Sequence, residues 1–160
     1  DLPVPIIAQV QGYCLGAGLE VAACCDLRVA SLDATFGMPE VRVGIPSVIE
    51  AALLPSLIGL GRTKQLVLTG ESISAEEAAR WGLVDRVVTK RELAEATHHW
   101  ASAIGAAGSH AIRLQKALLR RWEDLPPNRA IEEGILSFGR AFETDEPQRR
   151  MRAFLDRKRN

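Results

Sequence analysis

Glu20 and Glu40 are the two residues of this chain whose surroundings best suit proton transfer. Glu20 ends the run Gly16-Ala17-Gly18-Leu19-Glu20, where a glycine-rich turn leads into a predicted helix. Glu40 lies in Phe36-Gly37-Met38-Pro39-Glu40-Val41, directly after a predicted strand. Two carboxylates on separate loops can flank one pair of reacting carbons, one taking a proton and the other giving one. The structural alternatives are a first-turn acid that stabilises its helix and a turn residue that follows a proline.

The glycine-rich turn before Glu20 offers a place for negative charge. Unpaired backbone N–H groups and the positive end of the helix dipole meet where such a turn enters a helix. A bound phosphate is disfavoured, because a dinucleotide fingerprint needs a third glycine where Val21 stands and no Lys-Ser or Lys-Thr pair completes a phosphate loop. Since Glu20 would repel a phosphate, the turn favours an oxyanion that develops during a reaction.

The chain has 160 residues, the size of about one domain, and its helices and strands must position these glutamates. Its composition, 47% apolar and 25% charged, is typical of a globular protein. Periodicity predicts an α/β layer over residues 1–106 and helices over residues 107–160. Strands are predicted at 5–10, 27–30, 35–36 and 83–88, and helices at 19–25, 48–60, 63–68, 75–81, 91–106, 109–122, 128–142 and 146–158. The helix at 75–81 is expected to begin at the capping box Ser74-Ala75-Glu76-Glu77 and to end at Gly82.

Charge and hydropathy exclude several classes of protein. The formal net charge is zero, although the first 110 residues carry −4 and the last 50 carry +4. A dedicated nucleic-acid binder usually has a domain-wide basic excess, so we expect no nucleic-acid partner. No apolar stretch reaches the ~18 residues of a membrane span, and the first residues do not form a secretory leader. We therefore expect a cytoplasmic protein that has no membrane partner.

The three cysteines, Cys14, Cys24 and Cys25, show no metal-binding or disulfide pattern. They lack the CxxC spacing and lie in an apolar stretch, which is typical of small buried side chains in a reducing compartment. Cys14 has no recognisable histidine partner for a nucleophile. His98-His99 and His110 lack the HExxH spacing, and Ser47 lacks the GxSxG turn, so we expect no metal site and no nucleophilic serine.

Three segments in order carry a resemblance to a known family: Gly12-Tyr13-Cys14-Leu15-Gly16-Ala17-Gly18-Leu19-Glu20, Cys25-Asp26-Leu27-Arg28-Val29-Ala30 and Phe36-Gly37-Met38-Pro39-Glu40. Together they resemble the enoyl-CoA hydratase/isomerase (crotonase) family. The likeness continues at residues 68–71, 78–84 and 144–154, so it covers nearly the whole chain. It implies an α/β fold with a crotonase-like ββα spiral core, followed by a helical C-terminal region that mediates oligomerisation.

The resemblance also implies roles for particular residues. Glu20 and Glu40 fall on the positions of the family's two catalytic glutamates. Ala17, next to Gly16 in the ligand-binding turn, matches the residue whose backbone N–H forms one half of an oxyanion hole for the thioester carbonyl. Phe154 and Lys158 resemble the terminal segment that comes near the CoA nucleotide, although a charged helix face is the alternative interpretation.

The implied reaction is the reversible hydration of a 2-enoyl-CoA to a 3-hydroxyacyl-CoA, as in fatty-acid breakdown. We expect Glu20 to activate water and Glu40 to deliver a proton to Cα. No metal or redox cofactor is implied, because CoA enters as part of the substrate. The family resemblance implies a homotrimer or a dimer of trimers.

The sequence departs from the family pattern in two places. Family members carry a substantial stretch before the position that matches Asp1, including a loop with the second oxyanion N–H, so we expect the N-terminal part of the spiral to be absent here. If these residues are the whole polypeptide, we expect the isolated chain to be inactive and prone to associate. The second departure is at residues 44–52, where many relatives have a glycine-rich run. Val48 and Ile49 are expected to narrow the acyl pocket there, and Glu50, a third acid, is expected to be solvated.

Three alternative functions stay open. Another crotonase-type reaction, such as double-bond isomerisation, would use the same turn. A non-catalytic fragment would use its helices for assembly only. A nucleotide-binding module would need the glycine and lysine residues that the turn lacks.

Overall fold

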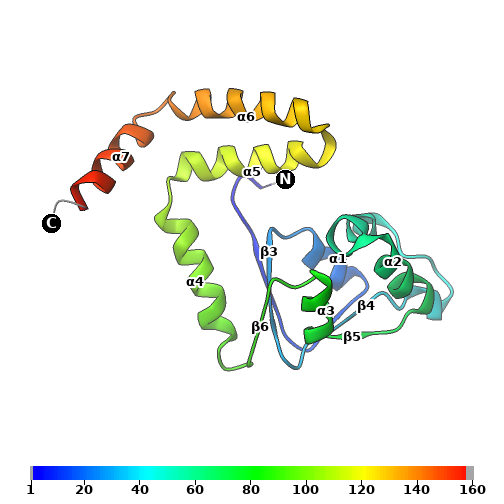
Figure 1. The fold of residues 1–160 in the computed structure, drawn as a ribbon. Coiled ribbons are helices and arrows are strands. Elements are labelled where there is room, and N and C mark those ends of the chain that lie inside the picture. The colour runs from blue at the N-terminus through cyan, green and yellow to red at the C-terminus, as the bar shows by residue number, and fades with distance from the viewer. Residues whose placement is uncertain (1, 158–160) are drawn as a thin grey trace. The chain divides into compact units, whose positions relative to one another are not determined.

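The structure is a computed structural model that describes residues 2–157, and the chain divides into two compact units (Figure 1). Ile6–Ala101 form the first, which we call the α/β unit. Residues 2–5 and 102–157 belong to the second, which we call the helical unit. Each unit is described by itself below. The oligomerisation role predicted for residues 107–160 stays a prediction.

The α/β unit contains two small sheets of three strands each. The first has the order β1-β3-β6 and is parallel throughout, with Ile7 opposite Leu27 and Val29 opposite Arg86. Its strands are β1 (Ile7–Val10), β3 (Leu27–Ser31) and β6 (Arg86–Val88). In the second sheet β2 pairs in parallel with β4, and β5 pairs antiparallel with β4. Its strands are β2 (Tyr13–Leu15), β4 (Thr35–Gly37) and β5 (Ile73–Ser74).

Successive segments of the chain repeat one pattern, with a strand in the first sheet, a strand in the second and then a helix. β1 and β2 lead to α1 (Ala17–Ala23), and β3 and β4 lead to α2 (Leu54–Thr69). Because parallel neighbours need a crossover connection, α1 carries the chain from β2 back to β3, the parallel neighbour of β1. This repeat is the ββα pattern that the family resemblance implies. After α2 the order changes, since β5 pairs antiparallel with β4 and a further helix precedes β6. The sequence patterns did not predict β2, since its residues lie in the segment interpreted as a glycine-rich loop.

The connection from β4 to α2 contains two short 3₁₀ helices. They are η1 (Glu40–Val43), which ends at Gly44, and η2 (Ile49–Leu53), which runs directly into α2. The sequence predicts separate helices at 48–60 and 63–68, and the structure has a break between two helical segments at Gly59. Gly59 has a non-helical backbone, with φ 78° and ψ 153°, so the helical path bends at this residue and then continues to Thr69.

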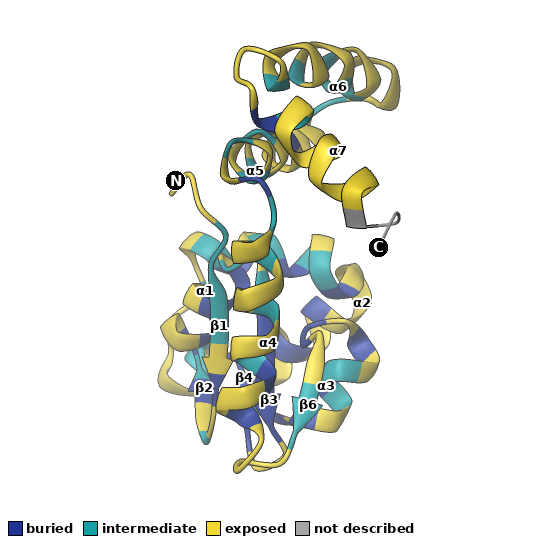
Figure 2. Cartoon of the chain, turned by 90° about the vertical axis from the view of Figure 1, so that its left-hand side faces the viewer, coloured by how far each residue is buried: buried dark blue, intermediate teal, exposed yellow. Residues whose placement is uncertain are grey.

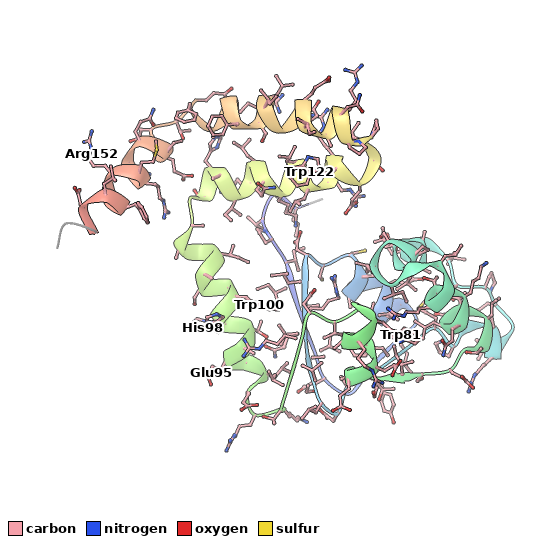
Figure 3. All side chains as sticks on the ribbon, viewed as in Figure 1. Trp81, Glu95, His98, Trp100, Trp122 and Arg152 are labelled. Atoms are coloured by element: carbon pink, nitrogen blue, oxygen red, sulfur yellow. The ribbon has the colours of Figure 1, made fainter. Side chains whose placement is uncertain are left out.

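A continuous apolar core fills the α/β unit, as the buried residues in Figure 2 show. Its fully buried side chains include Leu19 of α1, Phe36 of β4, Leu54 and Leu66 of α2, and Leu83. A smaller cluster joins α4 (Leu93–Ala106) to the first sheet, with Trp100 packed against Val29 and Leu93 (Figure 3).

Between β5 and β6 lies α3 (Ala75–Trp81), and its predicted cap is confirmed. The Ser74 side chain accepts a hydrogen bond from the Glu77 N–H at 3.1 Å, and Gly82 ends the helix with φ 86°.

The helical unit contains α5 (Ser109–Asp124), α6 (Pro127–Ala141) and α7 (Glu146–Arg157). α5 and α6 contact each other along their length and are joined by a short turn (Figure 1). The Trp122 indole N–H donates to the Ala130 carbonyl at 3.1 Å, and Arg121 forms an ion pair with Glu133 across the same pair of helices. Among the described residues, no helix combines the length and the apolar character that crossing a membrane requires.

Candidate active site

Gly16 lies in the turn before α1 and contacts the backbone of Glu20 and the side chain of Glu40. Its backbone has φ 54° and ψ −126°, a conformation that side chains strongly disfavour. Its N–H donates to the Gly37 carbonyl at 2.9 Å, which ties the start of α1 to the end of β4. Its carbonyl accepts the Leu19 and Glu20 N–H groups at 2.9 and 3.0 Å. Gly16 therefore links α1 to the strand that precedes Glu40.

Glu40 begins η1 and places its carboxylate directly over Gly16. A Cβ atom at Gly16 would lie 2.6 Å from Glu40 Oε1, so only glycine leaves room for this carboxylate. The other oxygen, Oε2, accepts a hydrogen bond from the Ser47 hydroxyl at 3.0 Å. The Glu40 side chain is half-buried. The two oxygens of Glu40 thus have different neighbours.

Glu20 is held in α1 and is only 8% exposed. Among residues 2–157 its carboxylate accepts no hydrogen bond, and no fully buried side-chain oxygen or nitrogen in this part of the chain lacks a partner. The Glu20 carboxylate oxygens therefore keep contact with solvent and can receive a water molecule or a ligand. Glu20 and Glu40 both reach Gly16, one through its backbone N–H and one through its side chain.

The two residues after Gly16 present free backbone donors. Ala17 and Gly18 are exposed and occupy the first two positions of α1, where no preceding turn of helix supplies an acceptor. Within the described residues, neither N–H group donates a hydrogen bond. These donors follow directly after Gly16, the residue that the Glu40 carboxylate approaches.

The remaining predicted CoA-binding residues lie outside the α/β unit. Phe154 lies on α7 in the helical unit and is exposed, while Lys158 lies outside the described residues. Their predicted contact with CoA stays a prediction.

Cys14 is buried, and this burial, followed by the influence of Cys25, raises the pKa of its thiol to about 11. A thiol with such a pKa stays protonated at neutral pH, which fits a packing role.

No metal centre is formed by the side chains of residues 2–157, since no three of their His, Cys, Asp and Glu side chains gather closely enough to hold an ion. His98 and His99 lie on α4, and His110 lies at the start of α5.

Sequence patterns missed Ser47 as a site residue. It was considered only as a nucleophile, whereas the structure places its hydroxyl on Glu40. No local signal predicts this contact, because it spans seven residues of irregular loop. The same loop carries Val48 and Ile49, whose apolar side chains are 53% and 72% exposed. Their predicted narrowing of an acyl pocket stays a prediction.

The order of strands and helices in the α/β unit fits a crotonase-like fold. Solved structures show this fold directly. The chain matches the crystal structure of an enoyl-CoA hydratase from Bacillus anthracis with a TM-score of 0.94 and 32% sequence identity, over 98% of this chain and 61% of the other. The fold is therefore a crotonase-like α/β fold with C-terminal helices.

This chain belongs to the enoyl-CoA hydratase/isomerase family, which matches residues 1–160. It is 40% identical over 156 residues to a crotonyl-CoA hydratase of Syntrophomonas wolfei, a match that covers 97% of this chain and 60% of the relative. It is 37% identical over 159 residues to a short-chain-enoyl-CoA hydratase of Clostridium acetobutylicum, covering 99% and 61%. The chain thus spans about 60% of the length of these curated relatives.

Proposed function

We propose that the natural polypeptide containing this chain catalyses the reversible hydration of 2-enoyl-CoA thioesters to 3-hydroxyacyl-CoA. The observation that supports this proposal is the Glu40 carboxylate over Gly16, in the turn that also carries the free N–H of Ala17 and leads into the helix of Glu20. The names of the relatives support it, since two of them are hydratases of short enoyl-CoA thioesters. Family membership alone supports only a crotonase-type reaction.

Hydration needs two proton transfers, and the two glutamates can divide them. Ionised Glu20 takes a proton from water as the water oxygen bonds to Cβ of the substrate. Protonated Glu40 gives its proton to Cα, and the electron pair of the double bond forms the new Cα–H bond through an enolate-like stage. Glu20 ends protonated and Glu40 ionised, so a proton must return from Glu20 to Glu40 before the next turnover. The reverse reaction runs the same steps backwards.

The thioester oxygen gains negative charge during this reaction. The N–H of Ala17 is oriented by Gly16 and has no competing acceptor among the described residues, so we propose that it donates to this oxygen. Loss of one such preorganised donor typically lowers kcat by about 10²–10³-fold. The chemistry requires no metal or redox group, because carboxylates carry both protons and CoA arrives on the substrate.

We assign the helical unit to assembly and CoA binding. We propose a homotrimer or a dimer of trimers, with Phe154 and Lys158 near the CoA nucleotide and the protein in the cytoplasm. The support for assembly is the apolar surface of α6 and α7, where Ile135 is 67% exposed and Phe138 is 70% exposed. Large apolar surfaces of this kind commonly mark interfaces.

The function is tested with the natural polypeptide and 2-butenoyl-CoA, by following the loss of the conjugated thioester absorbance. We expect Glu20→Gln and Glu40→Gln each to lower kcat by about 10²–10⁴-fold while circular dichroism is unchanged. Glu50→Gln is the matched control, because Glu50 is a half-buried acid of the neighbouring η2 helix with no role in the proposed reaction. Near-wild-type hydration by either catalytic variant would remove that residue from the acid and base pair.

The same assay separates the alternative functions. Consumption of 3-butenoyl-CoA with a gain of conjugated absorbance, and no hydration, would assign isomerisation instead. Oligomers detected by light scattering without turnover or CoA binding would assign a role in assembly only.

A further inference from the structure

We propose that Ser47 is a positioning residue that fixes which oxygen of Glu40 carries the transferred proton. The inference rests on the proposed function, because it assigns a task to Ser47 within the same reaction. The observation behind it is the asymmetric environment of the Glu40 carboxylate. Oε2 receives the Ser47 hydroxyl at 3.0 Å, and Oε1 lies over Gly16.

The loop after Glu40 is shaped to bring Ser47 back onto this carboxylate. Gly44 ends η1 with φ 83°, and the Ile45 N–H then donates to the Glu40 carbonyl at 3.2 Å. The loop therefore contacts Glu40 twice, through the Ile45 N–H on its backbone and through the Ser47 hydroxyl on its side chain. The Ser47 side chain is half-buried, so its hydroxyl competes less with solvent than a fully exposed one would.

Backbone strain beside Ser47 indicates that the loop conformation is imposed by its surroundings. Ile49 has φ 50°, the one described non-glycine residue with a positive φ. A β-branched residue in the left-handed region is a genuine outlier, and such strain persists only where neighbouring contacts determine the conformation. The contacts seen here are the hydrogen bonds to Glu40 and the direct continuation of η2 into α2.

The hydrogen bond from Ser47 determines the position of the proton on neutral Glu40. An oxygen that accepts a hydrogen bond from a hydroxyl acts as the carbonyl oxygen of the acid, so Oε2 is occupied and the acidic hydrogen stays on Oε1. Oε1 is the oxygen that adjoins Gly16, the residue before Ala17. The proton therefore leaves from the oxygen that faces the substrate.

The same hydrogen bond strengthens as the reaction proceeds. When the Oε1–H bond breaks and the new Cα–H bond forms, negative charge spreads over both oxygens of Glu40. A hydroxyl that donates to a charged oxygen forms a stronger bond than one that donates to a neutral oxygen. Ser47 thus favours the transition state over the bound substrate, which raises kcat and leaves KM nearly unchanged.

The test uses the natural polypeptide and compares Ser47→Ala with Ser47→Thr. Removing the hydroxyl in Ser47→Ala should lower kcat for 2-butenoyl-CoA by about 10- to 100-fold and change KM by less than about 3-fold, as expected for a hydrogen bond to a charged group. Threonine keeps the hydroxyl, so Ser47→Thr should restore kcat to within about 5-fold of wild type. If Ser47→Ala fails to fold by circular dichroism, Ser47→Gly replaces it as the deletion variant.

A double substitution shows whether Ser47 acts through Glu40. In a Glu40→Gln background, Ser47→Ala should lower kcat by less than about 2-fold, because the group that it supports is already lost. Equal losses in both backgrounds, or wild-type kcat in Ser47→Ala, would overturn the assignment while hydration by the wild type stands. Absence of hydration by the wild type is a different result, which would overturn the proposed function and this inference with it.

Discussion

The α/β unit and the helical unit are held together in different ways. The α/β unit buries a continuous core, in which Leu19, Phe36 and Met38 have no exposed surface. Among the described residues of the helical unit, Leu118 is the one buried apolar side chain. That unit exposes many large apolar side chains instead: Leu119, Trp122, Ile131, Ile135, Leu136, Phe138, Phe142, Met151, Phe154 and Leu155.

This difference shows where each unit obtains its structure. The α/β unit gains stability from its own packing, so the residues around Gly16 are positioned by contacts within one unit. In the helical unit, polar contacts such as those of Glu146 and Arg150 hold the helices together, and the apolar faces stay uncovered. Substitutions should therefore be costly in the first unit and mild on the exposed faces of the second.

The largest expected effect is that of removing Arg28 from the α/β unit. Its guanidinium is buried and donates to the Leu83 and Cys25 carbonyls at 2.8 and 2.7 Å, and it lies 3.5 Å from a carboxylate oxygen of Asp85. Arg28→Met should lower the free energy of unfolding by about 4 kcal/mol, because it leaves these acceptors without their donor. Arg152→Met, on an exposed position of α7, should change it by less than about 0.5 kcal/mol (Figure 3).

Urea unfolding gives the free energy of unfolding of both variants. Tryptophan fluorescence follows the transition, because each unit contains tryptophan. Trp81 and Trp100 lie in the α/β unit and Trp122 lies in the helical unit (Figure 3). A Trp122→Phe background confines the signal to the α/β unit. Similar losses from Arg28→Met and Arg152→Met would mean that the two units do not differ as described.

A second contrast compares two leucines. Leu66 of α2 is 1% exposed, whereas Leu136 of α6 is 54% exposed. Leu66→Ala should cost about 3 kcal/mol, from lost burial and the cavity that remains. Leu136→Ala should cost less than about 1 kcal/mol if its face stays uncovered. A larger loss for Leu136→Ala that depends on protein concentration would show that a second copy covers this face.

The next prediction concerns the polar contacts that hold α7 in the helical unit. The Ala111 N–H, and then the His110 N–H, donate to the Glu146 carboxylate at 3.1 and 3.3 Å and hold the pKa of Glu146 below its ordinary value. The positive charge of Arg150 acts in the same direction. Because the folded-state pKa is lowered, this stabilisation is complete above the ordinary carboxyl pKa and is lost as the pH falls through the lowered value.

Hydrogen exchange of the α7 amides measures this loss. Protection factors should decrease as the pH falls through the lowered pKa of Glu146, and Glu146→Gln should show low protection already at neutral pH. Glu143→Gln is the matched control, since Glu143 is an exposed acid near the start of α7. Unchanged α7 protection in Glu146→Gln would assign the attachment of α7 to its other contacts.

Sequence patterns predict the elements that depend on local signals and miss those that depend on distant contacts. Elements specified by local signals were predicted well, such as α3 with its Ser74 cap and the helices of the helical unit. β2 was missed because its strand character comes from pairing with β4, a distant segment, and its own residues resemble a turn. The helix end predicted near Gly59 matches the break there, because glycine readily adopts the positive φ that interrupts a helix.

The candidate site divides in the same way. Gly16, Ala17 and Glu20 form one continuous motif, so the sequence shows them together. The approach of Glu40 to Gly16 and the contact of Ser47 with Glu40 depend on how β4 and its following loop are placed. No periodic pattern encodes such contacts, so the sequence predicts Glu40 as a candidate without showing which residues it approaches.

The smallest expected effect concerns Ile49, where the well-packed α/β unit contains a strained residue. Its side chain is 72% exposed, so replacing it removes little burial, and its φ of 50° suits glycine. Ile49→Gly should relieve about 1–2 kcal/mol of strain and lose about 0.5–1 kcal/mol through the greater freedom of glycine in the unfolded chain, a net gain of up to about 1.5 kcal/mol. Val48→Gly is the matched control, because Val48 is also β-branched and exposed but has an extended backbone with φ −132°. If both substitutions lower the urea midpoint equally, Ile49 carries no strain, and the loop that presents Ser47 to Glu40 adopts its conformation without cost.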